Sequence, residues 1–146
     1  MNTVSPEAKS SSVRIEMRSA VIRDMLPWIE DILSDERVRV KTITEKSGYG
    51  HWHFQRVFRE QIGFNLAEYI RVRRIARAAH SVAFTDKEFI DIAIENGFTS
   101  QQNFSRTFKK YLRLPPMHFR QACCGRDRVF QTFTRELHEN YVGVFY

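Results

Sequence analysis

A repeat of about fifty residues constrains the fold of this chain more than any other feature of its sequence. The segment from Trp52 to Arg59 returns fifty positions later as the segment from Gln102 to Lys109, and both contain Phe-x-Arg-x-Phe followed by a cation. The repeat extends further, since Tyr69 is followed fifty residues later by Phe119. An internal duplication of this length predicts two copies of one small structural unit.

Each copy predicts a helix with one buried face and one polar face. Residues three, four and seven apart lie on the same side of a helix, so the phenylalanines of each copy, with Val57 in the first and Tyr111 in the second, are expected in the core. Gln, Arg and Lys beside small polar residues are the side chains that contact base edges and phosphates in a major groove. The polar faces carry these candidates for base contact: Trp52, Gln55 and Arg56 in the first copy, and Gln101, Gln102, Ser105 and Arg106 in the second.

The charge of the chain also favours a polyanion as partner. The formal net charge is +6, and basic residues follow one another from Arg56 to Arg77 and again from Arg106 to Arg120 with few acids between them. Each phosphate that a protein neutralises releases counterions, which favours binding to nucleic acid. A set of solvated helix surfaces would carry the same charge, and charge alone does not separate the two interpretations.

Length and composition predict one small folded domain in the cytoplasm. A chain of 146 residues, of which 42% are hydrophobic, can bury a modest core. No apolar run approaches the roughly 20 residues that a bilayer requires, and the first residues lack the pattern of a signal peptide. Cys123 and Cys124 are adjacent, a spacing typical of neither a metal site nor a disulfide framework, so no metal and no cofactor are expected.

The order of helix signals predicts an all-α fold of about seven helices. Residues 1–20 are polar without a period and predict a mobile arm. Apolar residues at helical spacing then predict a first helix, which should start no earlier than about Arg23 or else kink, because Pro27 is comfortable only in a first turn. A short second helix ends at Gly48, and a third runs from His51 to about Ile62. A short helix, a glycine turn and a helix with a polar face form a helix-turn-helix, as in homeodomains.

The second half repeats this order after a long helix. The helix expected from Leu66 to about Val82 contains no glycine or proline, which suits a stiff spacer. Thr85 and Glu88 have the spacing of a capping box and predict the start of a fifth helix, with Ile90 among its inward residues. A sixth helix, capped by Thr99 or Ser100, and a seventh follow. The expected division is an arm (1–20), a first helix-turn-helix subdomain (21–65), a linker helix (66–83), a second helix-turn-helix subdomain (84–121) and a tail (122–146).

Two parts of the sequence fit these patterns poorly. Arg39 stands at the start of the second helix, where Ser or Asp would be expected as the N-cap. In the tail, Phe130, Phe133, Leu137 and Tyr141 have the spacing of one apolar helix stripe, but the last residues fit no obvious element. The sequence assigns the tail no role.

Four motifs surround the two polar helices. They are Ser47-Gly48-Tyr49, Trp52-His53-Phe54-Gln55-Arg56, Gly97-Phe98-Thr99-Ser100-Gln101-Gln102 and Arg106-Thr107-Phe108. With these motifs and a Pro-Pro-x-x-Phe-Arg ending, the chain resembles the AraC/XylS family of bacterial transcription regulators, most closely its small MarA, SoxS and Rob subgroup, over about residues 21–120. Gly50 and His51 depart from that subgroup, which usually has Ser and often has Lys at these positions.

The resemblance implies an activator of stress or multidrug-resistance promoters that binds an asymmetric site on double-stranded DNA as a monomer. The two polar helices would enter successive major-groove segments on one face of the DNA. The protein would be in the bacterial cytoplasm, and on the nucleoid when bound. Once docked on DNA, it would contact RNA polymerase. If the spacer holds the helices closer than the roughly 34 Å repeat of straight DNA, the DNA must bend. The residues expected at phosphates are His51, Arg59, Ser100 and Lys109.

Three other classes of function fit the sequence less well. An enzyme is disfavoured because the five histidines are scattered and no paired carboxylate, nucleophile or glycine-rich phosphate loop is present. A small-molecule sensor is disfavoured because the roughly 25 residues after Arg120 leave no room for an effector domain. An architectural protein that bends DNA with weak sequence preference stays open, and competition by random DNA distinguishes it from a specific regulator.

Overall fold

The computed structural model describes residues 20–141, and within that range the chain is helical, with no strand. A first helix covers residues 20–32, and a further seven follow: α2 (Val40–Ser47), α3 (His51–Ile62), α4 (Leu66–Phe84), α5 (Phe89–Glu95), α6 (Gln101–Leu112), α7 (Pro116–Cys123) and α8 (Asp127–Asn140). The predicted all-α class is confirmed. The predicted arm, apart from residue 20, and the last five residues lie outside the described residues.

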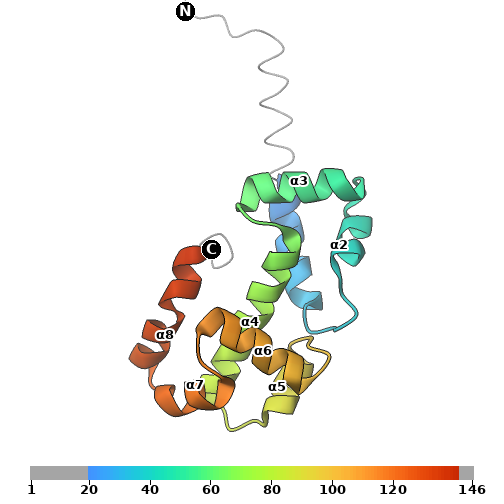
Figure 1. Cartoon of the computed structure of the whole chain (residues 1–146). Helices are drawn as coiled ribbons and strands as arrows, with labels where there is room; N and C mark the ends of the chain where they lie inside the picture. Colours follow the sequence, from blue (N-terminus) through green and yellow to red (C-terminus); the bar gives the residue numbers. More distant parts are fainter. Residues whose placement is uncertain (1–19, 142–146) are drawn as a thin grey trace, which may run out of the picture.

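The long helix α4 connects two groups of helices (Figure 1). The first helix, α2 and α3 surround one end of α4, and α5, α6 and α7 pack against its other end. One hydrophobic core runs through both groups. As the repeat predicts, Phe54 and Phe58 of α3 and Phe104 and Phe108 of α6 are at most 1% exposed. Each of the two polar helices, α3 and α6, is therefore fixed to the core by two phenylalanines at matching positions of the repeat.

Local signals account for most helix ends. Gly48 and Gly63 end α2 and α3 in the left-handed conformation, with φ of 76° and 98°. The side chain of Asn65 accepts a hydrogen bond from the backbone N–H of Glu68 at 2.8 Å and caps α4. These ends confirm the predicted bounds of α3 and the predicted start of α4.

Three local details differ from the expected ones. The first helix already includes residue 20, so the start expected at about Arg23 is wrong, and the kink expected as the alternative stays a prediction. Both Arg23 and Pro27 are exposed, so water can solvate the carbonyl that the proline leaves without a donor. Thr85 does not start α5: its hydroxyl and its backbone N–H both donate to the Ser81 carbonyl and close α4. Ile90 is 37% exposed instead of inward.

The tail forms an eighth helix, one more than the sequence predicted. α8 packs against α6 and α7, and its apolar stripe is the predicted one, with Leu137 only 3% exposed. At its end, the hydroxyls of Tyr141 and Tyr111 both donate to one carboxylate oxygen of Glu68, each at 2.7 Å. Burial alone would raise the pKa of Glu68, but hydrogen bonds from Arg71, Tyr141 and Tyr111 outweigh it and lower the pKa to about 2.

Arginines of α4 bind the first helix and the turn that follows it, where the second helix group also makes contact. Arg73 donates two hydrogen bonds, of 2.9 and 2.6 Å, to the carboxylate of Glu30 on the first helix. Arg74 donates to the backbone carbonyls that follow that helix, including Leu33 at 3.0 Å. Gly97, in the turn before α6, packs onto the same place: a Cβ on Gly97 would lie 2.5 Å from the Leu33 oxygen and 2.6 Å from Nε of Arg74. Part of the basic run expected to meet a polyanion is thus used inside the fold.

Candidate nucleic-acid interface

The polar face of α3 is presented to solvent. Trp52 is 81% exposed, Arg56 and Arg59 are exposed, and Gln55 is partly buried. The edge of the His51 ring packs against the Trp52 indole, with centroids 5.3 Å apart. No side chain caps the first turn of α3, so its first backbone N–H groups are open to an anion.

Arg56, which the sequence predicts at a base contact, is exposed and is paired with a residue of its own helix. Its Nε lies 3.4 Å from Oε1 of Glu60, and the two side chains are 80% and 55% exposed. An ion pair this exposed contributes at most about 1 kcal/mol. The guanidinium can therefore leave Glu60 for guanine, whose O6 and N7 accept a bidentate pair.

Gln55 is tied to the neighbouring helix through a histidine. The imidazole of His51 lies between Gln55 and Thr44 of α2, with Nε2 of Gln55 2.7 Å from its Nε2 and Oγ1 of Thr44 2.8 Å from its Nδ1. The Thr44 hydroxyl also donates to the Lys41 carbonyl at 3.2 Å. His51 is exposed and lies at the start of α3, which agrees with its expected place beside a phosphate. Both of its ring nitrogens, however, already have partners within the protein.

The polar face of α6 is less restrained. Ser100 caps the helix by accepting a hydrogen bond from the backbone N–H of Asn103 at 3.0 Å, which selects Ser100 over Thr99 as the cap. Ser105 is partly buried, and the other expected contact residues are exposed. Among the described residues, no side-chain hydrogen bond or ion pair holds any of these: Gln101, Gln102, Ser105, Arg106 and Lys109.

Both polar helices begin on the same side of the molecule. Figure 1 shows the starts of α3 and α6 at the right, on either side of a region where α2 and the turn from α5 to α6 come together. A groove of about 260 Å³ lies in that region, lined by the start of α2, by α4 and by the start of α6. Arg39 borders it and is exposed, and within residues 20–141 its guanidinium makes no hydrogen bond or ion pair. Burial, and then the charge of Arg39, lower the pKa of Arg74 at the groove floor.

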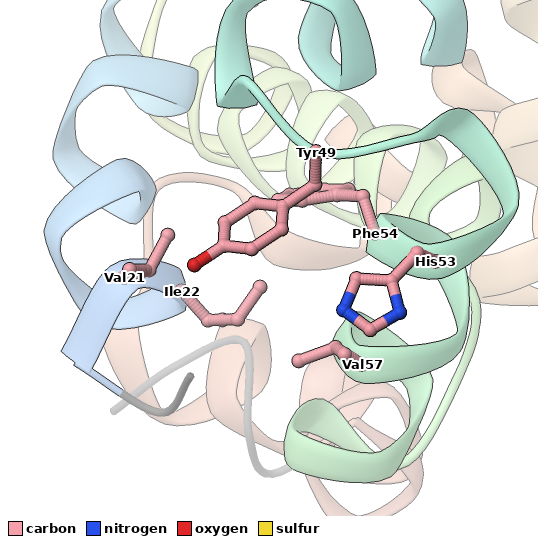
Figure 2. A pocket seen from close by; sticks show the side chains of 6 residues that line it. All are labelled: Val21, Ile22, Tyr49, His53, Phe54 and Val57. Atoms are coloured by element: carbon pink, nitrogen blue, oxygen red, sulfur yellow. The ribbon is translucent and has the colours of Figure 1, made fainter. Parts of the chain in front are cut away.

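An apolar pocket beside α3 is very small. Figure 2 shows it between the first helix and α3, with the His53 ring and the Tyr49 ring at its edge. Its volume of about 10 Å³ is close to that of a single water site, so it does not accommodate an organic effector. The lining residues are Val21, Ile22, Tyr49, His53, Phe54 and Val57.

Other kinds of site find no support in the described part of the chain. No group of His, Cys, Asp or Glu between residues 20 and 141 is arranged to hold a metal ion. Cys123 is buried and Cys124 exposed, and both are free thiols. Within the same residues, no helix combines the length and the apolar character that a membrane crossing requires.

Sequence reasoning did not select two residues that lie beside the predicted contact residues, Thr44 and Arg39. Thr44 reads as an ordinary small residue in a helix, and only the distance to His51 shows that it anchors Gln55. Arg39 was noticeable as a poor N-cap, and that irregularity was the available signal. Nothing in the sequence pattern places Arg39 beside the second copy.

Comparison with known proteins identifies the family. A family model described as a helix-turn-helix domain matches residues 43–122. The probable transcription factor PqrA of Proteus vulgaris is 42% identical over 106 residues, 72% of this chain and 87% of that protein. The transcriptional activator AarP of Providencia stuartii is 43% identical over 110 residues, 75% of this chain and 81% of that protein. The regulator Rob of Salmonella typhimurium is 36% identical over 105 residues, 72% of this chain but 36% of that protein.

A solved structure supports the fold. The DNA-binding domain of AdpA, crystallised with a target DNA, superposes with a TM-score of 0.68 over 73% of this chain and 96% of that domain, at 20% identity. The matched family and the similar proteins are transcription regulators and not enzymes. From the two copies of the motif and these matches, the chain belongs to the AraC/XylS family and is a sequence-specific DNA-binding transcription regulator.

Proposed function

We propose that the protein activates stress or multidrug-resistance promoters, binding an asymmetric site as a monomer and then contacting RNA polymerase. The name of the similar protein AarP, a transcriptional activator, supports the activating role. The proposal includes the division into helix-turn-helix subdomains of residues 21–65 and 84–121, joined by a linker helix. Activity would be set by the amount of protein in the bacterial cytoplasm.

One observation carries the binding mode: two polar helix faces, each backed by buried phenylalanines, begin on one side of the molecule (Figure 1). In the first half of the site, Arg56 would pair with guanine, Gln55 with adenine, and Trp52 would pack on sugars or thymine methyl groups. Arg59 would meet the backbone one turn further along, and the start of α3 at His51 would lie beside a phosphate.

In the second half, Arg106 would pair with guanine and Gln102 with adenine. Gln101 and Ser105 would flank these contacts on the base-facing side of α6. The hydroxyl of Ser100, which accepts from Asn103, keeps its own proton for a phosphate oxygen. Lys109, which occupies the position of Arg59 in the second copy, would contact the DNA backbone one turn further along α6.

Between the halves, Arg39 would contact a central phosphate. It borders the groove between the starts of α2 and α6. Within residues 20–141, its guanidinium has no hydrogen-bond acceptor that would compete with DNA. Arg71 and Arg74 line the same groove, but Arg71 is paired with Glu68 at 2.7 Å and Arg74 with backbone carbonyls. Arg39 is therefore the cation of this groove that DNA would meet first.

Footprinting on candidate promoters tests the binding mode, using wild type, Arg56→Ala and Arg106→Ala. Each variant should lose about 1–3 kcal/mol of binding free energy on sites that keep its guanine, with weaker protection in its own half. Arg135→Ala, which removes an equal charge from the exposed side of α8, should have little effect. Equal losses on every sequence, and a ratio of specific to random binding near one, would instead support an architectural DNA-bending protein.

A further inference from the structure

The hydrogen bonds around His51 have one self-consistent direction. The Thr44 hydroxyl has a single proton, which it donates to the Lys41 carbonyl at 3.2 Å. Its oxygen therefore accepts from Nδ1–H of His51, at 2.8 Å. A neutral imidazole with its proton on Nδ1 has a lone pair on Nε2, and that lone pair accepts from Nε2–H of Gln55, at 2.7 Å.

We propose that His51 is a positioning residue that sets the base preference of Gln55, because the series Thr44, His51, Gln55 fixes which way the Gln55 amide faces. This inference rests on the proposed contact between Gln55 and a base. A primary amide has two N–H groups, and only the one on the far side from Oε1 can point back along the helix to His51. The other N–H stays beside Oε1 on the outward edge.

That outward edge has the pattern that adenine complements. A donor and an acceptor side by side match N7 and N6–H of adenine, whereas guanine presents two acceptors, N7 and O6. A glutamine without a partner could rotate its amide to suit other bases. Here the anchor is firm, because Thr44 is 1% exposed and belongs to a different helix. Because His51 holds the inner N–H of the Gln55 amide, the outward edge of the amide favours adenine over guanine.

The test measures binding to duplexes that differ at single base pairs in the half-site of α3. Comparison of wild type with Gln55→Ala first locates the base pair that Gln55 reads, and its ratio of affinity for adenine over guanine is the quantity followed. We expect His51→Ala to lower that ratio roughly fivefold or more, and Thr44→Val to lower it by a smaller factor. In the Gln55→Ala background, His51→Ala should change it no further.

His53→Ala is the matched control, since His53 is exposed on the same helix and contacts the Tyr49 ring instead of Gln55. It should leave the ratio unchanged. If His51→Ala weakens both duplexes equally and lowers only the salt dependence, His51 is a phosphate contact and the inference is wrong. If Gln55→Ala changes no base preference, the proposed role of Gln55 fails first, and the inference fails with it. Thermal unfolding of each variant separates these results from loss of fold.

Discussion

Gly97→Ala should destabilise the contact between the two helix groups, where Gly97 packs against Leu33 and Arg74. We call this contact the joint. Two effects add. Gly97 has φ of +81°, and a residue with a Cβ in the left-handed region costs roughly 1–2 kcal/mol. The new Cβ would also lie 2.5 Å from the Leu33 oxygen and 2.6 Å from Nε of Arg74. Both atoms belong to one hydrogen bond of 3.0 Å, and losing a bond from a charged donor costs about 1.5–3 kcal/mol.

The repeat supplies a matched control. Gly48 occupies the corresponding turn of the first copy with φ of +76°, and nothing lies within 4 Å of a Cβ placed there. Gly48→Ala should therefore show only the backbone cost, about 1–2 kcal/mol, whereas Gly97→Ala should lose about 3–5 kcal/mol of the free energy of unfolding. For a chain of this size the difference corresponds to a separation of roughly 5–12 °C in Tm.

Urea and thermal unfolding, followed by circular dichroism, measure both losses. Wild type, Gly48→Ala and Gly97→Ala are compared at one protein concentration, and the difference between the two variants is the quantity of interest. Equal losses would refute the reasoning, because they would mean that the contact of Gly97 with Leu33 and Arg74 contributes nothing to the stability of the joint.

Three further predictions test single interactions. The pKa of Glu68 is lowered from 4.5 to about 2 on folding, so the stability that its carboxylate contributes is present above pH 4.5 and is lost as pH falls towards 2. At pH 7 the free energy of unfolding of wild type should exceed that of Glu68→Gln by about 2–3 kcal/mol. A difference that persists at pH 2 would contradict this linkage. Glu60→Gln should raise affinity for a specific site about two- to fivefold in a filter-binding assay, since it frees Arg56 and removes a negative charge near the DNA; a decrease would mean that Glu60 orients the guanidinium. Arg39→Ala should reduce the slope of log affinity against log salt by about 1 on every sequence, while an unchanged slope would remove Arg39 from the interface.

The sequence predicted the elements that neighbours along the chain determine. The bounds of α3 follow from the period of its phenylalanines and from two glycines, and the helix runs from His51 to Ile62 as expected. The buried and exposed faces of α3 and α6 follow from the same period. The stripe of the tail also predicted a helix, although not what that helix packs against.

The interactions that sequence reasoning missed join residues far apart in the chain. Arg73 and Glu30 are 43 positions apart, and Tyr141 and Glu68 are 73 positions apart. A run of arginines has the same net charge whether it binds DNA or carbonyl groups, so composition cannot separate the two. Thr85 shows the limit for local signals as well: the capping-box spacing was present, but the hydroxyl bonded to Ser81 behind it.

The joint also governs the shape of the bound DNA. Major-groove segments on one face of straight DNA repeat every 34 Å or so, and a joint held by Arg73, Arg74 and Gly97 cannot stretch freely to match that repeat. If this joint holds α3 and α6 closer than that repeat, the DNA must bend, and the bend is measured as a rise in energy transfer between dyes at the ends of a short duplex. Gly97→Ala, which loosens the joint, should bend the same duplex less at saturating protein, while Gly48→Ala should bend it like wild type. An equal bend with both variants would place the rigidity in α4 alone and not in the contact between the copies.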